Sequence, residues 1–167
     1  MIHPIHSNDE NIPLLSAEAK AELRVLYDKL DAEVAGLGPV CQLSGRCCRF
    51  EEYGHTLFVS SSEVQFLLEV APEPSRELDQ GKTCPWQNAN GHCTARDGRP
   101  IGCRVYYCDP TYERSAHDLS ERYIAQLKEL SNRHGLAWNY APLHRQLKSN
   151  LKMQIEKPPD DSFLTLL

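Results

Sequence analysis

The residues of this chain that are best suited to chemistry are seven cysteines, all of which lie between residues 41 and 108 of 167. Two of them are adjacent, in the segment GRCCRF at residues 45–50. Thiolate sulfur is the soft ligand that zinc, copper(I) and iron–sulfur clusters prefer. The sequence therefore predicts a thiolate-rich metal site. Its candidate ligands are Cys41, Cys47, Cys48, Cys84, Cys93, Cys103 and Cys108.

The spacing of the cysteines limits which kinds of metal site the sequence could form. They follow the pattern C-x5-C-C and then C-x8-C-x9-C-x4-C, which contains no C-x2-C pair. The usual signature of a zinc finger or ribbon is therefore missing. Two plainer interpretations are open, namely small apolar cysteines buried in a core, and disulfides, although an odd number cannot all pair within the chain. The grouping within one turn-rich segment favours metal binding over both.

The adjacent cysteines bear on how many metal positions the site has. Successive side chains point in different directions, so we expect Cys47 and Cys48 not to act as two free ligands of one ion. They would serve two neighbouring metal positions, or one would bind metal while the other bridges or packs. A thiol–disulfide enzyme that uses the pair is a further alternative, but the C-x2-C motif within a βαβ pattern is absent. The pair favours a polynuclear centre.

Two arginines directly follow cysteines, Arg49 after Cys48 and Arg104 after Cys103. Metal-bound thiolates leave net negative charge, which a guanidinium group offsets while it donates hydrogen bonds to sulfur. We therefore expect Arg49 and Arg104 to contact the bound metal group. Other charged residues lie near the cysteines; a solvated surface role is equally open for the arginines among them, a surface role is the plainer interpretation for the histidines, and the aspartate is either a ligand or part of a turn. These are Arg46, His55, His92, Arg96, Arg99 and Asp109.

The cysteine motifs, taken in order, resemble those of a known family. They are CQLSGRCC at 41–48, CPW at 84–86, GHC at 91–93 and GRPIGCRVYYC at 98–108. This series is similar to the pattern of the YkgJ-type cysteine-cluster family, bacterial proteins described as zinc- or iron-chelating or as iron–sulfur-cluster-containing. The resemblance implies metal binding through all seven cysteines and implies no particular reaction. Ser44 stands where that family has its second cysteine.

Composition excludes several other functions. A net charge of -5 argues against a general nucleic-acid binder, and no apolar run is long enough to cross a membrane. The N-terminal residues MIHPIHSNDENIP have no basic region followed by an apolar one, so we expect no secretory signal and a cytoplasmic location. Cytosolic thiols are kept reduced, which favours metal or redox chemistry over structural disulfides. Phosphate-binding loops, nucleophile elbows and H-E-x-x-H motifs are absent, so whether the protein is an enzyme stays open.

The expected fold is mainly α with an irregular cysteine-rich centre and short strands, in one small metal-stabilised domain over residues 16–152. Residues 1–15 and 153–167 are expected to be mobile. Apolar stripes and caps predict helices over about 16–35, 61–71 and 115–134, with Ser16 as an N-cap and a capping box at Ser60 and Glu63. A short strand is expected near 56–59, and a further helix from Pro142. Turn residues are frequent between 84 and 110.

These observations predict a cytoplasmic metal-binding protein that holds an iron–sulfur cluster, or zinc or iron ions, through clustered thiolates. A redox or accessory role and an unknown protein partner are open. Iron–sulfur is favoured over zinc because seven sulfurs exceed one four-ligand zinc site and fall one short of two. The alternative is a zinc-stabilised protein-interaction module without catalysis.

Overall fold

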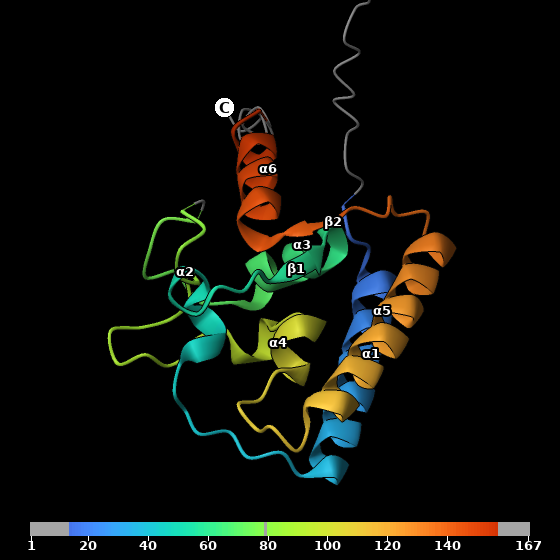
Figure 1. Ribbon diagram of the computed structural model, residues 1–167. Helices are drawn as coiled ribbons and strands as arrows, with labels where there is room; N and C mark the ends of the chain where they lie inside the picture. Colours follow the sequence, from blue (N-terminus) through green and yellow to red (C-terminus); the bar gives the residue numbers. More distant parts are fainter. Residues whose placement is uncertain (1–13, 79, 157–167) are drawn as a thin grey trace, which may run out of the picture.

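The computed structural model describes residues 14–78 and 80–156, which form a mainly helical domain with a two-stranded sheet (Figure 1). The α-helices are α1 (Ala17–Leu37), α2 (Phe50–Tyr53), α3 (Ser61–Val70), α4 (Ile101–Val105), α5 (Glu113–Arg133) and α6 (Leu143–Glu156). The other elements are the 3-10 helices η1 (Arg46–Cys48) and η2 (Arg96–Gly98) and the strands β1 (Phe58–Ser60) and β2 (Tyr140–Pro142). The expected class, mainly α with short strands in one small domain, is confirmed. Among the described helices, none is both long and apolar enough to cross a membrane.

Helices α1 and α5 lie side by side and antiparallel along one edge of the molecule (Figure 1). The ion pairs between them, Arg133 with Glu22 and Arg122 with Glu33, follow opposite orders along the two helices, as antiparallel packing requires. The apolar stripes predicted for both helices are buried in their interface, which confirms the predicted period. The buried residues include Leu23, Leu26, Leu30, Val34, Leu119, Tyr123, Leu127 and Leu130.

The ends of these elements follow local capping chemistry. Ser16 caps α1 as predicted, because its Oγ accepts the Ala19 N–H at 3.1 Å, and the helix stops at Gly38 with a φ of +66°. The capping box of α3 is also present: Ser60 Oγ accepts the Glu63 N–H at 3.2 Å, and Glu63 Oε2 accepts the Ser60 N–H at 2.9 Å.

The small sheet differs from the expectation. Strand β1 lies at 58–60 rather than 56–59, and it pairs antiparallel with β2, which the sequence did not predict. Pro142 is the last residue of β2 and faces Phe58, so α6 begins one residue later than expected. Proline can occupy such a position because a strand at a sheet edge does not need its N–H.

The predicted chain ends fall mostly on residues outside the described ranges. Of the N-terminal arm predicted at 1–15, residues 14 and 15 are described, and Leu15 is buried with its N–H donating to Gln65 Oε1 at 2.7 Å. The packed core therefore begins slightly earlier than predicted. Of the tail predicted at 153–167, residues 153–156 continue α6.

Helix α4 lies in the segment that the sequence indicated to be irregular, and a carboxylate from α3 holds its first residue. Glu63 Oε1 accepts the Ile101 N–H at 2.8 Å and the Tyr27 O–H at 3.4 Å. Glu63 is only 1% exposed, and burial raises the pKa of its carboxyl above the usual value although its hydrogen bonds act in the opposite direction. One buried carboxylate thus ties α1, α3 and α4 together.

We expect Glu63→Gln to remove part of the pH dependence of stability. Because its pKa is raised, the folded chain holds the Glu63 proton more tightly than the unfolded chain does. The stabilisation from protonated Glu63 is fully present below the usual value of 4.5 and is lost as the pH rises through the folded-state pKa. The free energy of unfolding of the wild type minus that of Glu63→Gln should therefore fall between acidic and neutral pH. Urea unfolding at matched pH values measures this difference, and a constant difference would contradict the assignment.

Candidate metal centre

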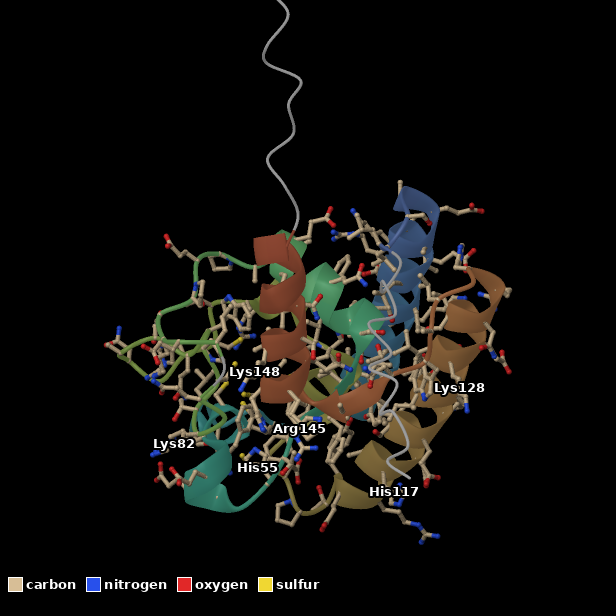
Figure 2. All side chains as sticks on the ribbon, turned by 90° about the horizontal axis from the view of Figure 1, so that it is seen from above. His55, Lys82, His117, Lys128, Arg145 and Lys148 are labelled. Carbon is tan, nitrogen blue, oxygen red and sulfur yellow. The ribbon has the colours of Figure 1, made fainter. Side chains whose placement is uncertain are left out.

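One cavity, of about 110 Å³, is lined by all seven cysteines although they span residues 41–108. Different elements supply them: the coil before η1, η1 itself, the loop between α3 and η2, α4, and the coil after α4. Figure 2 shows the yellow sulfur atoms on the side of the molecule that carries His55 and Lys82, away from α5. All seven cysteines therefore border the same cavity, as their clustering in the sequence indicated.

Backbone and amide hydrogen bonds bring the cysteine-bearing segments together. The Cys84 N–H donates to the Cys48 carbonyl at 2.7 Å, which places these two segments side by side. Gln87 Nε2 donates to the carbonyls of Gly45 and Gly91, each at 3.0 Å. Gly45 has a φ of +70°, and a Cβ there would lie 2.6 Å from Gln87 Nε2. Position 45 therefore requires glycine both for its conformation and for the close approach.

The adjacent thiols converge, which corrects the expectation that they point apart. The sulfur atoms of Cys47 and Cys48 are 3.9 Å apart. With metal–sulfur bonds of about 2.3 Å, two thiolates on one tetrahedral ion lie roughly 3.8 Å from each other. The observed separation therefore suits two ligands of the same metal. The cause is η1, a single 3-10 turn that starts after Gly45 in the left-handed conformation and presents both side chains to the cavity.

Cys48 lies at the centre of four thiols that we call the sulfur quartet. The quartet consists of Cys47, Cys48, Cys84 and Cys93. Hydrogen bonds with the other three raise the pKa of Cys48. The same interactions lower the pKa of Cys47 to about 7 and of Cys93 to about 6, and they lower that of Cys84. Metals bind the thiolate and not the thiol. The lowered pKa values of these three thiols therefore favour the form that binds metal.

The other three cysteines line the cavity outside the quartet. Cys103, on α4, is half-buried, and its desolvation together with the charge of Cys84 raises its pKa well above the usual value. Cys108 lies beside Ser44, with 3.4 Å between its Sγ and the serine Oγ. Cys41 is exposed. The cavity lining thus contains the quartet, a half-buried thiol from α4, and the thiols of Cys41 and Cys108.

The donor set fits a soft or borderline metal, because every candidate ligand is a thiol that faces one space. Over residues 14–78 and 80–156, no three His, Cys, Asp or Glu side chains form an arrangement that could already hold a metal ion. The thiols line a common cavity, and the Cys47–Cys48 pair stands at the separation of two ligands on one metal.

Arg104 does not take the role expected from its place beside Cys103. Its Nε donates to the Arg99 carbonyl at 2.6 Å, and its Nη2 donates to the Asp97 carbonyl at 2.7 Å. Its Nη1 donates to Asp31 on α1 at 2.6 Å. The guanidinium group therefore bonds to protein acceptors and joins η2 and α4 to α1, and it is not part of the cavity lining.

Arg49 also contacts protein groups and does not line the cavity. Its Nη2 donates to the Ser44 carbonyl at 2.6 Å, and its Nη1 pairs with Glu52 on the surface at 3.1 Å. The guanidinium lies over the Tyr53 ring, 5.2 Å from the centroid. Arg49 therefore fixes the backbone at Ser44, which faces the cavity, and acts on the site through that serine.

Arg96 and Arg99 line the cavity. They therefore occupy the position beside the cysteines that was expected for Arg49 and Arg104. Their positive charges lower the pKa of Cys93, as a guanidinium group does when it favours a nearby thiolate. The sequence alone left these two undecided between a site role and a surface role.

Of the remaining charged residues near the cysteines, one lines the cavity and the others make contacts elsewhere. His92 lines the cavity, whereas His55 stacks on Tyr106 with ring centroids 5.8 Å apart. Asp109 Oδ1 accepts the Thr111 N–H at 3.0 Å and its hydroxyl at 2.7 Å, which is the turn interpretation. Arg46 lies over the Tyr53 ring at 5.1 Å.

Sequence reasoning missed two residues that shape the site. Gln87 joins the segments at 45 and 91 through its side-chain amide, and no motif signals this role. Glu63 was recognised as a helix cap, but its second bond, to the first residue of α4, depends on tertiary contact.

The chain was also compared with family models, curated proteins and solved structures, and none of the three comparisons found a match. The resemblance of its cysteine motifs to the YkgJ-type family therefore stays a prediction. The geometry and donor chemistry of the cavity are the basis of the functional argument.

Proposed function

We propose that this chain is a metal-binding protein that holds an iron–sulfur cluster, or zinc or iron ions, through the sulfur quartet. One observation carries the proposal: seven cysteines that span residues 41–108 all line one cavity of about 110 Å³. Buried apolar cysteines would have no reason to gather around a shared space, and none of the seven is in a disulfide. Bound metal would also stabilise this part of the fold, where regular structure is short.

The proposal includes the family resemblance and a cytoplasmic location. The motifs that carry the resemblance all contribute residues to the cavity, and reduced thiols are what a reducing compartment maintains. Arg96 and Arg99 would offset the negative charge of metal-bound thiolates. A cluster would supply electron transfer, whereas zinc would supply structural cross-linking.

An iron–sulfur cluster is the leading candidate for the bound metal group, and the adjacent Cys47 and Cys48 indicate which cluster geometry it would have. In a rhombic two-iron cluster each iron takes two thiolates, whereas in a cuboidal cluster each iron takes one. The 3.9 Å separation of the Cys47 and Cys48 sulfur atoms suits two thiolates on one iron. The quartet supplies the four thiolates that a rhombic cluster needs.

The second candidate is a zinc-stabilised interaction module without catalysis. The same 3.9 Å separation favours it, because two thiolates on one tetrahedral zinc ion lie roughly 3.8 Å apart. The quartet would then form a closed four-sulfur site, and the remaining three cysteines would not bind metal.

Purification without oxygen, followed by elemental analysis and an absorption spectrum, separates these forms. We expect a brown protein that contains iron and acid-labile sulfide and that bleaches on reduction. A colourless protein with stoichiometric zinc would reject the cluster and support the interaction module. A chain without bound metal that also takes up none when iron with sulfide, or zinc, is added under reducing conditions would refute the proposal.

A further inference from the structure

Ser44 is placed to donate a hydrogen bond to Cys108. Its Oγ is 3.4 Å from the Cys108 Sγ, a contact that joins residues 64 positions apart. The same Oγ accepts the Arg46 N–H at 3.4 Å. A hydroxyl has one proton and two lone pairs, so the backbone bond occupies a lone pair and leaves the proton free for the sulfur.

Tyr106 carries the second hydroxyl near the same sulfur. Its side chain interacts with Cys108, and both line the cavity. The ring stacks on His55 with an interplanar angle of 12°, and His55 Nε2 is 3.3 Å from the Cys47 carbonyl. Figure 2 labels His55 on the sulfur-bearing side of the molecule. The Tyr106 ring is therefore positioned by His55, which in turn contacts the backbone of η1.

Several contacts fix the short segment that carries Ser44. Arg49 Nη2 donates to the Ser44 carbonyl at 2.6 Å. The preceding residue, Leu43, has a φ of +51°, a conformation that costs energy in a residue with a side chain. The backbone of Val40 bonds to Asp109, next to Cys108. The segment is thus held against residues 106–109 through the Val40–Asp109 and Ser44–Cys108 contacts.

We propose that Ser44 and Tyr106 are positioning residues that donate hydrogen bonds to the sulfur of Cys108 and make it a ligand of a second metal position beside the quartet. This inference depends on the proposed function. Hydrogen bonds to an ionised acceptor are about twice as strong as neutral ones. Such bonds orient a ligand and tune the metal that it holds. On this view Ser44 does not leave a gap where the related motif has a cysteine, because it supports another sulfur.

Anaerobic titration of the full-length, metal-free chain with Co²⁺ tests the proposal, since sulfur-to-cobalt charge transfer reports thiolate ligation. Ser44→Ala and Tyr106→Phe each remove one hydroxyl with little change in volume. Each is expected to weaken cobalt binding at the position that Cys108 serves about tenfold, the lower end of the effect of outer-shell changes, and to alter the charge-transfer band. Tyr140→Phe is the matched control, because Tyr140 lies on β2, stacks on Trp138 and is not part of the cavity lining. It should retain the wild-type affinity.

The Cys108→Ser background separates action through sulfur from a general effect on the loop. There, Ser44→Ala and Tyr106→Phe should have no further effect on cobalt affinity. Unchanged affinity in the two single variants, or an equal loss with and without Cys108, would overturn the inference while the proposed function stands. A wild-type chain that binds no cobalt and no other thiophilic metal would remove both.

Discussion

Cys48→Ser is expected to remove nearly all bound metal. Cys48 interacts with the thiols of Cys47, Cys84 and Cys93, so its loss removes the one thiol that contacts all three others. Serine is close to cysteine in size, but its hydroxyl is not a soft ligand and keeps its proton at neutral pH. The loss of affinity should exceed the tenfold that outer-shell changes typically cost. Elemental analysis of protein purified without oxygen gives the metal per chain.

Cys41→Ser is the matched control for this experiment. Cys41 also lines the cavity, but it is exposed and outside the quartet. The control should keep most of its metal. Equal metal content in the two variants would show that the quartet is not the ligand set. Circular dichroism of both variants, with metal removed, checks that the helices persist.

The sequence predicted the long helices well because their signals are local. The buried stripe of α1 and the cap at Ser16 depend on residues within a few positions of one another, and so does the capping box of Ser60 and Glu63. Helix α4 has only five residues, and the bond to its first N–H comes from Glu63, 38 positions away. Strand β2 has three residues, and its partner β1 is about 80 positions away. Such elements form through tertiary contact, which local propensity does not contain.

The grouping of the cysteines in the sequence predicted which of them line the candidate site, but it did not predict where the side chains point. The cysteines share a cavity as predicted. The convergence of Cys47 and Cys48 depends on the 3-10 turn after Gly45, whereas the sequence led us to expect successive side chains to point in different directions. Arg104 follows a cysteine in sequence, yet its acceptors include Asp31, which is 73 positions away on another helix. Adjacency in sequence therefore identified an important arginine and misjudged what it binds.

Arg104→Lys is expected to destabilise the folded chain by about 3 kcal/mol although it keeps the positive charge. Arg104 is 6% exposed, and its guanidinium donates to Asp31 and to the carbonyls of Arg99 and Asp97 at 2.6–2.7 Å. The group also lies 4.0 Å from the centroid of the Tyr27 ring. An ammonium group is a point charge that cannot reach three acceptors arranged around a planar fork. Each hydrogen bond to a charged group contributes about 1.5–3 kcal/mol, so the loss of one or two gives this magnitude.

Arg122→Lys is the matched control, because Arg122 bonds to both carboxylate oxygens of Glu33 on the surface at 3.0 and 2.7 Å. Its cost should stay within about 1 kcal/mol. Urea unfolding of the metal-free chains measures both changes. If Arg104→Lys keeps wild-type stability but lowers bound metal, then Arg104 acts on the metal group directly, as its place after Cys103 first indicated. A loss of stability in the metal-free chain would establish that Arg104 holds η2 and α4 against α1, and that it supports the cavity through Arg96, Arg99 and Cys103.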